Sequence, residues 1–584
     1  MFQREPTREE VNKGRHELRK VRQRSRGLFW FVAIFTSFVN ALMLTGPLYM
    51  LNVYDRVLGS RSLETLVALS VLVAFLYLMM GILDYARGRI MGRIGARLQS
   101  DLDERVFNAS LRAQASGRVP VEAATGQRDL EAVQRAITSP VAMSLFDLPW
   151  TPLFILGIFI FHPFLGYLAL AGGSVLVAVA IVNQVSSREP LTDANRASHQ
   201  SESMGDQLRE GSDTIQALGM REAAFQRWSH MRNLALGATI TAGDRGGAFG
   251  SISKSFRLFL QSAMLGLGAY LVLNGELTPG AMIAGSILLG RALAPIEMLV
   301  NQWPVVQRGQ AGWKNLARLL GAIGVPERKT QLPVPKAHIV ADQVTVLPPG
   351  DTKASLRLIS FDVKPGQAVG VIGPSGAGKT TLAKALAALW HPAGGTIRLD
   401  GASLDQYEPD VLGSYIGYLP QTVTLLQGTI RDNIARMSTA PDDAAVIKAA
   451  KRAAAHNMIL KLPDGYDTIV DASGGRLSGG QVQRIGLARA MYGDPVFLVL
   501  DEPNSNLDNE GSVAVNAAIK SMRDEGKAVF VMAHRPAAIE QCDMLMYIDG
   551  GLLKAFGPTE EVKKQILANR QQIDQGKGQG GGVT

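Results

Sequence analysis

Residues 368–383 read AVGVIGPSGAGKTTLA, a short apolar run followed by a glycine-rich turn and a helix-forming segment. The turn matches the pattern GxxxxGK[ST] in its proper setting, between a strand and a helix. Its glycines allow successive backbone N–H groups to point into one concavity, and the start of the helix adds positive potential. The pattern predicts a loop that binds the phosphates of a nucleotide.

Each residue of this loop has an expected role at the nucleotide. Lys379 is expected to reach the β- and γ-phosphates, and the Thr380 hydroxyl is expected to hold Mg²⁺. The other nucleotide-binding residues of the loop are expected to be Gly373, Pro374, Ser375, Gly376, Ala377, Gly378 and Thr381. The predicted cofactors are therefore ATP and Mg²⁺.

A second apolar strand, VFLVLDE at residues 496–502, ends in two carboxylates. Asp501 fits the Mg²⁺ shell, and Glu502 fits a base that orients and polarises the attacking water. The alternative, that the two acids end this strand by chance, is weak once the phosphate loop is present. From about Ile339 onward, strand-like and helical runs alternate, which predicts an α/β domain of the P-loop NTPase type.

The segment LSGGQ, from Leu477 to Gln481, opens a helix shortly before these carboxylates. It holds no nucleophile that needs activation, but Ser478, Gly479 and Gly480 at a helix start suit phosphate binding. Between a phosphate loop and an LDE strand, it resembles the signature of the ABC (ATP-binding cassette) family. The family's other motifs also occur in order, and the resemblance covers residues 340–565. They are Gln421 in LPQ, Asp508 in SNLD and His534 in VMAHR.

The resemblance implies a dimeric mechanism. Ser478, the two glycines and Gln481 of one chain would close over the γ-phosphate held by the loop of a second chain, so the working unit would be a homodimer. Gln421 would sense Mg²⁺ and the γ-phosphate and would couple the site to the membrane helices, so the expected metal-binding residues are Thr380, Gln421 and Asp501. His534 would hold the γ-phosphate and the attacking water, which makes Glu502 and His534 the expected catalytic residues. Asp508 would act across the dimer interface.

The sequence departs from the family pattern at two places. Pro348 stands where many members stack an aromatic ring on adenine, a contact worth about 1–3 kcal/mol. Weaker nucleotide affinity or a looser base preference is expected from this change. Asp471-Ala472-Ser473 stands where many exporters carry a Gly-Glu pair ahead of the signature. The contribution of this pair to coupling is therefore in doubt for this chain. Neither departure affects the hydrolytic residues.

The first half of the chain has a different character, because six apolar segments there are long enough to span a bilayer as helices of roughly 20 residues. They lie near 27–52, 64–84, 141–161, 163–184, 255–274 and 278–301. The stretches 85–140 and 185–254 carry repeated charged faces and are expected to continue the helices into water. Short helices around 128–138 and 211–220 are expected to dock on the ATPase domain. A large soluble helical protein is a weak alternative.

Lysine and arginine are concentrated in alternate loops. Residues 1–26 and 85–140 carry nine each, whereas the connections on the other side carry almost none. Basic loops stay cytoplasmic, so both termini and both long loops are expected on the cytoplasmic side of a bacterial inner membrane. The net charge of +9 is thereby explained by topology and gives no reason to expect nucleic acid. The loop 52–66, NVYDRVLGSRSLETL, is expected to face outward.

Arg291 lies near the middle of the last expected span. An arginine there costs about 2.5–3.5 kcal/mol on insertion scales. Two alternatives remain open: the side chain faces a water-filled path or a partner, or it forms an interhelical ion pair. Pro295 is expected to bend this helix.

The loop 52–66 and the stretch DLPWTPLFI at 147–155 resemble the type I secretion ABC transporters of Gram-negative bacteria, closest to the PrtD-type protease exporters. The resemblance implies ATP-driven export of unfolded polypeptides that keep a C-terminal signal. It also implies a periplasmic adaptor (membrane fusion) protein and an outer-membrane channel as partners. With 26 residues before the first span and its single cysteine at position 542, the chain is expected to have no N-terminal peptidase domain.

Two other functions are alternatives to this assignment: export of lipids or small molecules, and a role as a DNA-repair or translation ATPase. A lipid or small-molecule exporter would share the ATPase and the six spans, but it is expected to lack the DRVL and PWTP stretches. Helix capping and pairing through Asp55 and Arg56 is an equally simple explanation for those two residues. A DNA-repair or translation ATPase is excluded by the six spans.

The expected organisation therefore has five parts. They are a basic cytoplasmic segment (1–26), a six-helix transmembrane domain of the exporter type (27–320), a linker (321–338), an ABC ATP-binding domain (339–565) and a glycine-rich tail (566–584). The tail composition predicts disorder. The single cysteine, Cys542, excludes an internal disulfide and is expected to be a free buried thiol.

Overall fold

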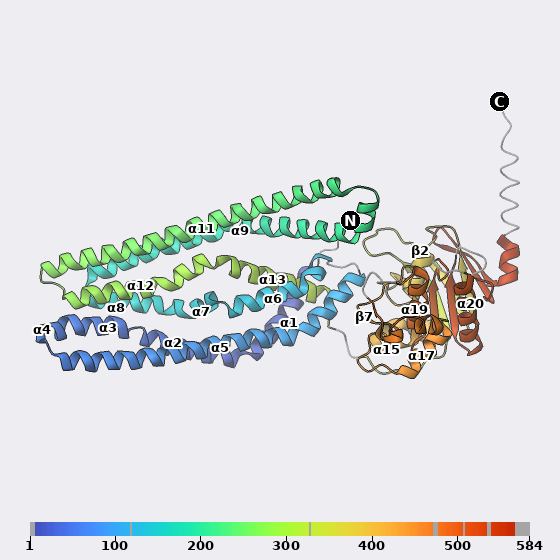
Figure 1. Cartoon of the computed structure of the whole chain (residues 1–584), viewed down its shortest axis with the longest axis horizontal. Helices are drawn as coiled ribbons and strands as arrows, with labels where there is room; N and C mark the ends of the chain where they lie inside the picture. The colour runs from blue at the N-terminus through green and yellow to red at the C-terminus, as the bar shows by residue number, and fades with distance from the viewer. Residues whose placement is uncertain are drawn as a thin grey trace, which may run out of the picture. The chain divides into compact units, whose positions relative to one another are not determined.

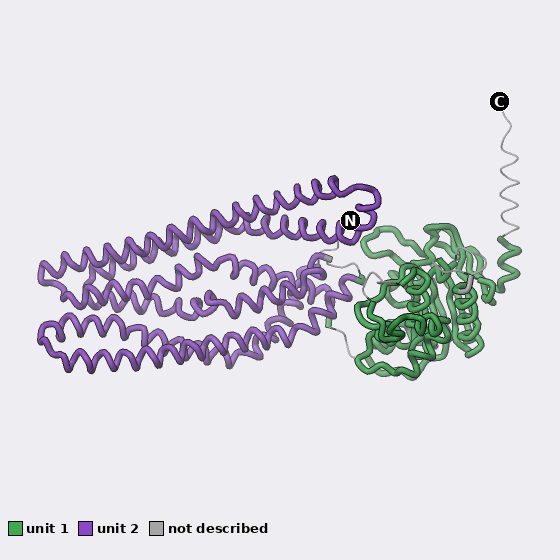
Figure 2. The backbone as a smooth tube through the Cα atoms, viewed as in Figure 1, with its two compact units in different colours: residues 1–4, 115–118, 325–584 green, residues 5–114, 119–324 purple. Residues whose placement is uncertain are grey.

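The computed structural model describes residues 6–116, 120–325, 329–470, 477–505, 509–533 and 539–566. The chain divides into two compact units (Figure 2). The helical unit comprises residues 5–114 and 119–324, and the α/β unit comprises residues 325–584 with the short segments 1–4 and 115–118. Each unit has a hydrophobic core of its own.

The helical unit is a bundle of long helices that run side by side (Figure 1). Its α-helices are α1 (Arg8–Arg24), α2 (Arg26–Leu42), α3 (Thr45–Asn52), α4 (Leu58–Ser60), α5 (Leu63–Ser116), α6 (Pro120–Thr138), α7 (Pro140–Asp147), α8 (Thr151–Phe161), α9 (Pro163–Glu210), α10 (Ser212–Ala217), α11 (Arg221–Leu273), α12 (Pro279–Asn301) and α13 (Trp303–Ala322). A π-helical turn, η1 (Val53–Val57), precedes α4, and a 3₁₀ turn, η2 (Leu148–Trp150), precedes α8.

Six helical stretches are long and apolar enough to cross a membrane, and each contains most or all of one expected span. They are Arg26–Ser60, Leu63–Ser116, Pro140–Phe161, Pro163–Glu210, Arg221–Leu273 and Pro279–Asn301. Three of them are 54, 48 and 53 residues long. Because roughly 20 residues cross a bilayer, these three helices continue well beyond it, in agreement with their charged faces.

The loop that joins the first two spans is fixed to the last span by Asp55. Its carboxylate accepts hydrogen bonds from the Thr278 hydroxyl (2.7 Å) and from the Gly280 backbone N–H (2.9 Å) at the start of α12. A carboxylate at a helix N-terminus satisfies donors that have no partner within the helix. Gly280 is needed there, because a Cβ atom would lie 2.6 Å from Asp55 Oδ1. Asp55 therefore caps a helix, as the helix-capping explanation expected, whereas Arg56 is exposed and forms no ion pair with any described residue.

A buried charge network joins α2, α5 and α7. The Arg87 guanidinium, 8% exposed, contacts Asp147 Oδ1 at 2.9 Å and Asp84 Oδ1 at 2.6 Å. Asn40 donates a further hydrogen bond to Asp147 Oδ1 (2.8 Å). Asp147 is the first residue of DLPWTPLFI, so this stretch carries an interhelical contact that its sequence alone did not reveal.

Residues 128–138 differ from their expected form. They are the second half of α6, a 19-residue helix that packs on α13 through Leu130 and Val133. Asp129 accepts a hydrogen bond from Asn315 of α13 (3.2 Å), and Gly312 allows the close approach of the two helices. Apolar residues recur at helical spacing from 123 to 137, and this pattern favours one continuous helix over a short separate one. The other expected short helix appears as α10, within residues 211–220.

The α/β unit is built on a six-stranded sheet in the order β12-β11-β3-β10-β9-β6. Its strands are β3 (Ala368–Ile372), β6 (Ile416–Leu419), β9 (Phe497–Asp501), β10 (Ala528–Met532), β11 (Met544–Asp549) and β12 (Leu552–Pro558), and only β12 pairs antiparallel. A second sheet, in the order β2-β1-β4-β5, contains β1 (Ile339–Val346), β2 (Leu356–Val363), β4 (Gly394–Leu399) and β5 (Ala402–Ser403). A small pair joins β7 (Gly428–Thr429) to β8 (Ile469–Val470).

Both faces of the main sheet are covered. Leu498 and Leu500 of β9 belong to one hydrophobic cluster, and Phe497 and Val499 belong to another. Successive side chains of a strand point to opposite faces, which explains why these strands read as continuous apolar runs. The helices are α14 (Lys379–Leu386), α15 (Pro409–Tyr415), α16 (Ile430–Ile434), α17 (Asp443–Arg452), α18 (His456–Leu460), α19 (Gly479–Met491) and α20 (Asn509–Asp524), with 3₁₀ turns η3 (Leu404–Gln406) and η4 (Gly465–Asp467).

Cys542 is buried in the first of these clusters, as expected, with 6% of its surface exposed. Burial raises the pKa of its thiol to about 12. Since the thiolate is the reactive form, this cysteine is a poor nucleophile near neutral pH.

Candidate functional site

The site lies at the carboxyl ends of three neighbouring parallel strands. Met532 at the end of β10 is paired with Asp501 of β9 on one side and with Val371 of β3 on the other. Ligands of parallel sheets bind at this edge. The phosphate loop follows β3 and the two carboxylates end β9, so the sheet register brings these segments to one edge although they are more than a hundred residues apart.

The phosphate loop turns tightly between β3 and α14. Gly376 and Gly378 have φ values of 77° and 106°, in the left-handed region that glycine adopts without strain. A Cβ atom at Gly378 would lie 2.6 Å from Leu356 Cδ2 and 2.9 Å from the Ser355 carbonyl oxygen. The loop conformation therefore depends on glycine at this position, for both backbone and packing reasons.

Lys379 is the first residue of α14 and only 5% exposed. Its Nζ donates to the carbonyl oxygens of Gly373 (2.9 Å) and Pro374 (3.0 Å), inside the loop concavity. Burial lowers the pKa of Lys379, and the carboxylates of Glu502 and Asp501 oppose that shift. The structure thus holds a buried ammonium group, facing two carboxylates, at the position where phosphate charge is expected.

Asp501 meets the requirements for a Mg²⁺ ligand. Its Oδ1 accepts a hydrogen bond from the Thr380 hydroxyl (3.3 Å), so the two expected metal ligands are neighbours. Its Oδ2 is buried and has no hydrogen-bond partner among the described residues. Burial raises the pKa of Asp501, the Thr380 hydrogen bond lowers it and the Glu502 charge raises it. One carboxylate and one hydroxyl suit Mg²⁺, which completes its shell with phosphate oxygens and water.

Glu502 is held in an unusual backbone conformation. Its φ is 51°, in the left-handed region, and its backbone N–H donates to the Met532 carbonyl of β10 (3.0 Å). Strained backbone of this kind gathers at functional sites. Gln421 Nε2 donates to Glu502 Oε2 (3.1 Å), which joins the segment after β6 to the expected catalytic base.

The segment LSGGQ begins α19 with a reciprocal cap. The Ser478 hydroxyl accepts from the Gln481 backbone N–H (3.3 Å), and the Gln481 side chain accepts from the Ser478 N–H (2.8 Å). Ser478 and Gly479 are exposed at the helix start. Two residues further on, the buried Gln483 donates to the Pro503 carbonyl (3.2 Å). Sequence reasoning missed Gln483, although its position just after LSGGQ offered a signal.

The structure brings together Lys379, Thr380, Gln421, Asp501 and Glu502 as the sequence predicted. His534, Asp508 and the stretch Asp471-Ala472-Ser473 lie outside the described residues, so their roles stay predictions. Pro348 accepts a hydrogen bond from the Asp351 N–H within a turn (3.1 Å), and its effect on adenine binding also stays a prediction.

Comparison with known proteins matches both units to one family. Residues 356–505 match the family described as ABC transporter, and residues 29–293 match the ABC transporter transmembrane region. The type I secretion system ATP-binding protein PrsD of Rhizobium meliloti (strain 1021) is 39% identical over 546 residues, which cover 94% of each chain. The chain belongs to the type I secretion ABC transporters.

Other relatives of this type I secretion transporter are more distant. The toxin RTX-I translocation ATP-binding protein of Actinobacillus pleuropneumoniae is 28% identical, and the cyclolysin secretion/processing ATP-binding protein CyaB of Bordetella pertussis is 27% identical. Each alignment covers 92% of this chain and 76% of the relative. A solved bacterial Atm1-family ABC exporter with ATP bound has a TM-score of 0.79 at 21% identity, covering 94% of this chain and 98% of that chain. These findings confirm the exporter fold and an ATP-hydrolysing, multi-pass membrane transporter.

The raised pKa of Asp501 leads to a prediction about this transporter. A proton on the carboxyl group competes with Mg²⁺, because the metal binds the carboxylate. Below the raised pKa, the Mg²⁺ affinity of the ATP-loaded chain is expected to fall about tenfold per pH unit, starting at a higher pH than for an ordinary aspartate near 3.9. Mg²⁺ titrations of nucleotide binding at a series of pH values would measure this slope.

Asp501→Asn is expected to lower Mg²⁺ affinity at every pH and to remove the slope. Glu560→Gln, which alters a carboxylate that is 79% exposed, is expected to leave the Mg²⁺ affinity and its dependence on pH unchanged. A pH-independent Mg²⁺ affinity in the unmodified chain would contradict the assignment of Asp501 as a ligand.

Proposed function

We propose that this transporter uses ATP hydrolysis to export unfolded polypeptides that keep a C-terminal secretion signal. The observation that carries the proposal is the 39% identity to PrsD, which extends over both the helical and the α/β unit. The names of the more distant relatives refer to toxin translocation and cyclolysin secretion. They support polypeptide cargo over a lipid or small-molecule cargo, which the fold alone would also accommodate.

In the proposed reaction, the phosphate loop and Lys379 bind the β- and γ-phosphates. Thr380, Asp501 and Gln421 would hold Mg²⁺, which neutralises phosphate charge when bound. Glu502 accepts a proton from the attacking water as the bond to the γ-phosphorus forms and ADP leaves. His534 would position this water, and Gln421 would report the state of the site through its hydrogen bond to Glu502.

A second copy of the chain is part of this proposal. The exposed Ser478 and the glycines at the start of α19 would contact the γ-phosphate bound by the partner, with Gln481 fixing the serine. Helix N-termini favour anions, and each chain would contribute half of two sites. Asp508 is expected to act at the same interface.

The distribution of charge supports the proposed membrane placement. The basic residues of 1–26, 85–140 and 185–254 favour cytoplasmic termini and long loops in a bacterial inner membrane. The loop 52–66 would then face the periplasm, near an adaptor protein that leads to an outer-membrane channel. No nucleic-acid partner is proposed.

A comparison of secreted proteins tests the function. The chromosomal copy is replaced by Glu502→Gln, and the proteins of the culture medium are compared with those of the parent and of a Glu560→Gln strain. We expect one or a few polypeptides to disappear from the medium and to accumulate in the cells of the Glu502→Gln strain alone. Unchanged secreted proteins, together with an altered lipid or drug profile, would support the small-molecule alternative instead.

A further inference from the structure

Helix α19, which begins with the LSGGQ segment, is connected to the backbone beside the expected catalytic base. The side chain of Gln483 is only 2% exposed, and its Nε2 donates to the carbonyl oxygen of Pro503 (3.2 Å). Pro503 directly follows Glu502 in the chain. Both partners of this hydrogen bond are buried, so breaking it would leave a donor and an acceptor without water to replace the bond.

The backbone around Glu502 is held by three hydrogen bonds. Its N–H donates to the Met532 carbonyl (3.0 Å), and its own carbonyl accepts from the Ser505 N–H (3.2 Å). The third bond joins the next carbonyl, that of Pro503, to Gln483. A residue with a φ of 51° keeps this conformation because its surroundings impose it. The position of the Glu502 carboxylate therefore depends in part on where Gln483 holds the chain.

Helix α19 also contacts the segment after β6 that carries Gln421. Arg489 Nη1 donates to the Thr424 carbonyl (3.0 Å). Gly486 lies close to the same segment, since a Cβ atom there would lie 2.6 Å from Val423 Cγ1. Because the Gln421 side chain donates to the carboxylate of the base, α19 is linked to the base by two routes. One passes through Pro503 and the other through the segment after β6.

The start of α19 is built to move as a unit with Gln483. The helix has 13 residues and is about 20 Å long. Its first turn is closed by the reciprocal cap between Ser478 and Gln481, and Ser478 and Gly479 are exposed. Gln483 lies four residues after Gly479, which is about 6 Å along the helix. A displacement of the exposed start is thus carried to the Gln483 side chain.

We propose that Gln483 is a positioning residue that makes the catalytic base of one site depend on ATP in the other site. The inference rests on the proposed dimer, in which Ser478 contacts the ATP held by the partner. When that ATP is bound, the start of α19 is held, and Gln483 fixes the Pro503 carbonyl so that the Glu502 carboxylate faces the attacking water. When the partner's loop is empty, α19 shifts and the carboxylate moves with it. Gln483 takes no part in the proton transfer itself.

Mixed dimers of the full chain in lipid nanodiscs test the inference, assembled from two chains with different affinity tags. One chain, the reporter, keeps an intact catalytic base and phosphate loop. Its partner is catalytically silent and comes in two forms. The loaded partner carries Glu502→Gln and is expected to hold ATP, whereas the empty partner carries Lys379→Ala and is expected not to bind it. Hydrolysis then comes from the reporter, and its rate shows whether the partner's ATP matters.

The unmodified reporter is expected to hydrolyse ATP about tenfold more slowly beside the empty partner than beside the loaded one. Gln483→Met keeps the length of the side chain and removes its donor. Beside the loaded partner, a Gln483→Met reporter is expected to lose about tenfold in kcat with little change in KM for ATP, the size of one lost hydrogen bond. Replacing the loaded partner by the empty one is then expected to cost at most about a further twofold, because the link is already broken.

Tyr407→Phe is the matched control. It also removes a buried hydrogen bond from a side chain to a backbone carbonyl, that of the Tyr407 hydroxyl to Leu399 (2.9 Å). These two residues belong to the other hydrophobic cluster of the α/β unit, on the face of the sheet away from α19. A Tyr407→Phe reporter is expected to keep the full tenfold dependence on the partner's ATP. The same full dependence in a Gln483→Met reporter would overturn the inference.

A measurement without any change at Gln483 accompanies the kinetics. In an isotope-labelled, otherwise unmodified reporter, hydrogen exchange of the Ser505 amide is expected to be about tenfold faster beside the empty partner, because the turn that holds the base loosens. Unchanged exchange would overturn the inference even if Gln483→Met did not fold. Equal hydrolysis by the unmodified reporter beside both partners would contradict the proposed dimeric site itself, and the inference with it.

Discussion

Purified Glu502→Gln is expected to hydrolyse ATP about 10²- to 10⁴-fold more slowly than the unmodified chain, with little change in KM for ATP. This range is the usual effect of removing a general base. Glutamine has nearly the same shape as glutamate and can still accept the hydrogen bond from Gln421, so the local geometry is kept. The change removes only the ability to accept a proton from water, an interaction that strengthens in the transition state.

Steady-state kinetics of phosphate release, with ATP binding measured separately, would check this expectation. Glu560→Gln serves as the control, because it makes the same chemical change at an exposed position of the α/β unit. A kcat within threefold of the unmodified value would show that another group takes the proton. A large rise in KM would instead assign Glu502 to nucleotide binding.

Arg87→Leu is expected to destabilise the helical unit by about 3–5 kcal/mol, the usual cost of removing one partner from a buried ion pair. It would leave the Asp147 carboxylate, which is 14% exposed, with Asn40 as its neutral partner. The loss would appear as a lower unfolding midpoint of the full chain in denaturing detergent. ATP binding to the α/β unit of the same full chain gives a second readout. Arg87→Leu is expected to change this binding less than it changes the unfolding midpoint.

Two further variants make the expectation specific. Arg135→Leu breaks a pair whose side chains are 75% and 53% exposed, so it is expected to cost at most about 1 kcal/mol. Arg87→Leu combined with Asp147→Leu removes both buried charges and is expected to recover most of the stability. A double variant that is less stable than Arg87→Leu alone would contradict an ion-pair origin of the effect.

The nucleotide site was largely predictable from sequence, because its parts are local. The phosphate loop needs only a strand, glycines at fixed offsets and a helix, and all of these lie within residues 368–386. The carboxylates similarly follow a strand that is buried on both faces. The hydrogen bond from Gln421 to Glu502 confirms that two separately recognised motifs meet. The positive φ of Glu502 was not predictable, because no local pattern records it, and neither was the hydrogen bond of its N–H to β10.

The six spans were predictable for a similar reason, because apolar composition over a fixed length decides membrane insertion. The contacts between the spans were not. Arg87 and Asp147 are 60 residues apart, and Asp55 and Gly280 are 225 apart. No local pattern records such pairs, which depend on how the helices pack. The helix expected around 128–138 is present but begins earlier, at Pro120, and this extent was missed for the same reason: α6 packs on α13.

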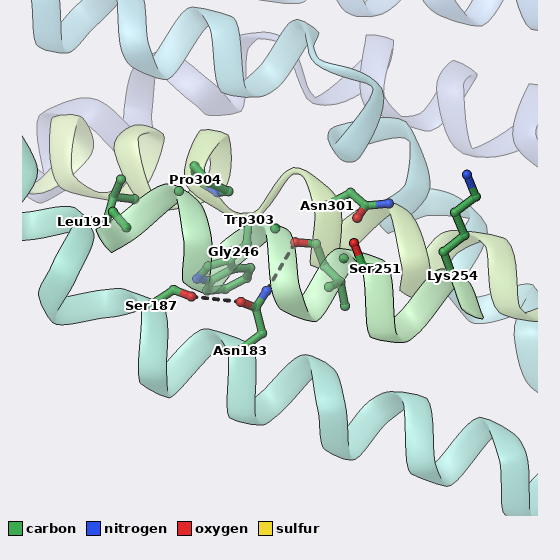
Figure 3. Close-up of a pocket in the computed structure, with 14 residues that line it drawn as sticks. Asn183, Ser187, Leu191, Gly246, Ser251, Lys254, Asn301, Trp303 and Pro304 are labelled. Atoms are coloured by element: carbon green, nitrogen blue, oxygen red, sulfur yellow. Dashed lines mark hydrogen bonds between the residues drawn. The ribbon is translucent and has the colours of Figure 1, made fainter. Parts of the chain in front are cut away.

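The cap formed by Asp55 has a mechanical consequence. It anchors one end of α12, whose 23 residues make a rod about 35 Å long. The other end, at Asn301, borders a cavity of about 390 Å³ (Figure 3). With this end fixed, a rotation of the helix by about 10° would displace Asn301 by about 6 Å. A small angular change at the Asp55 end would thus become a residue-sized movement at the opposite end of the last span.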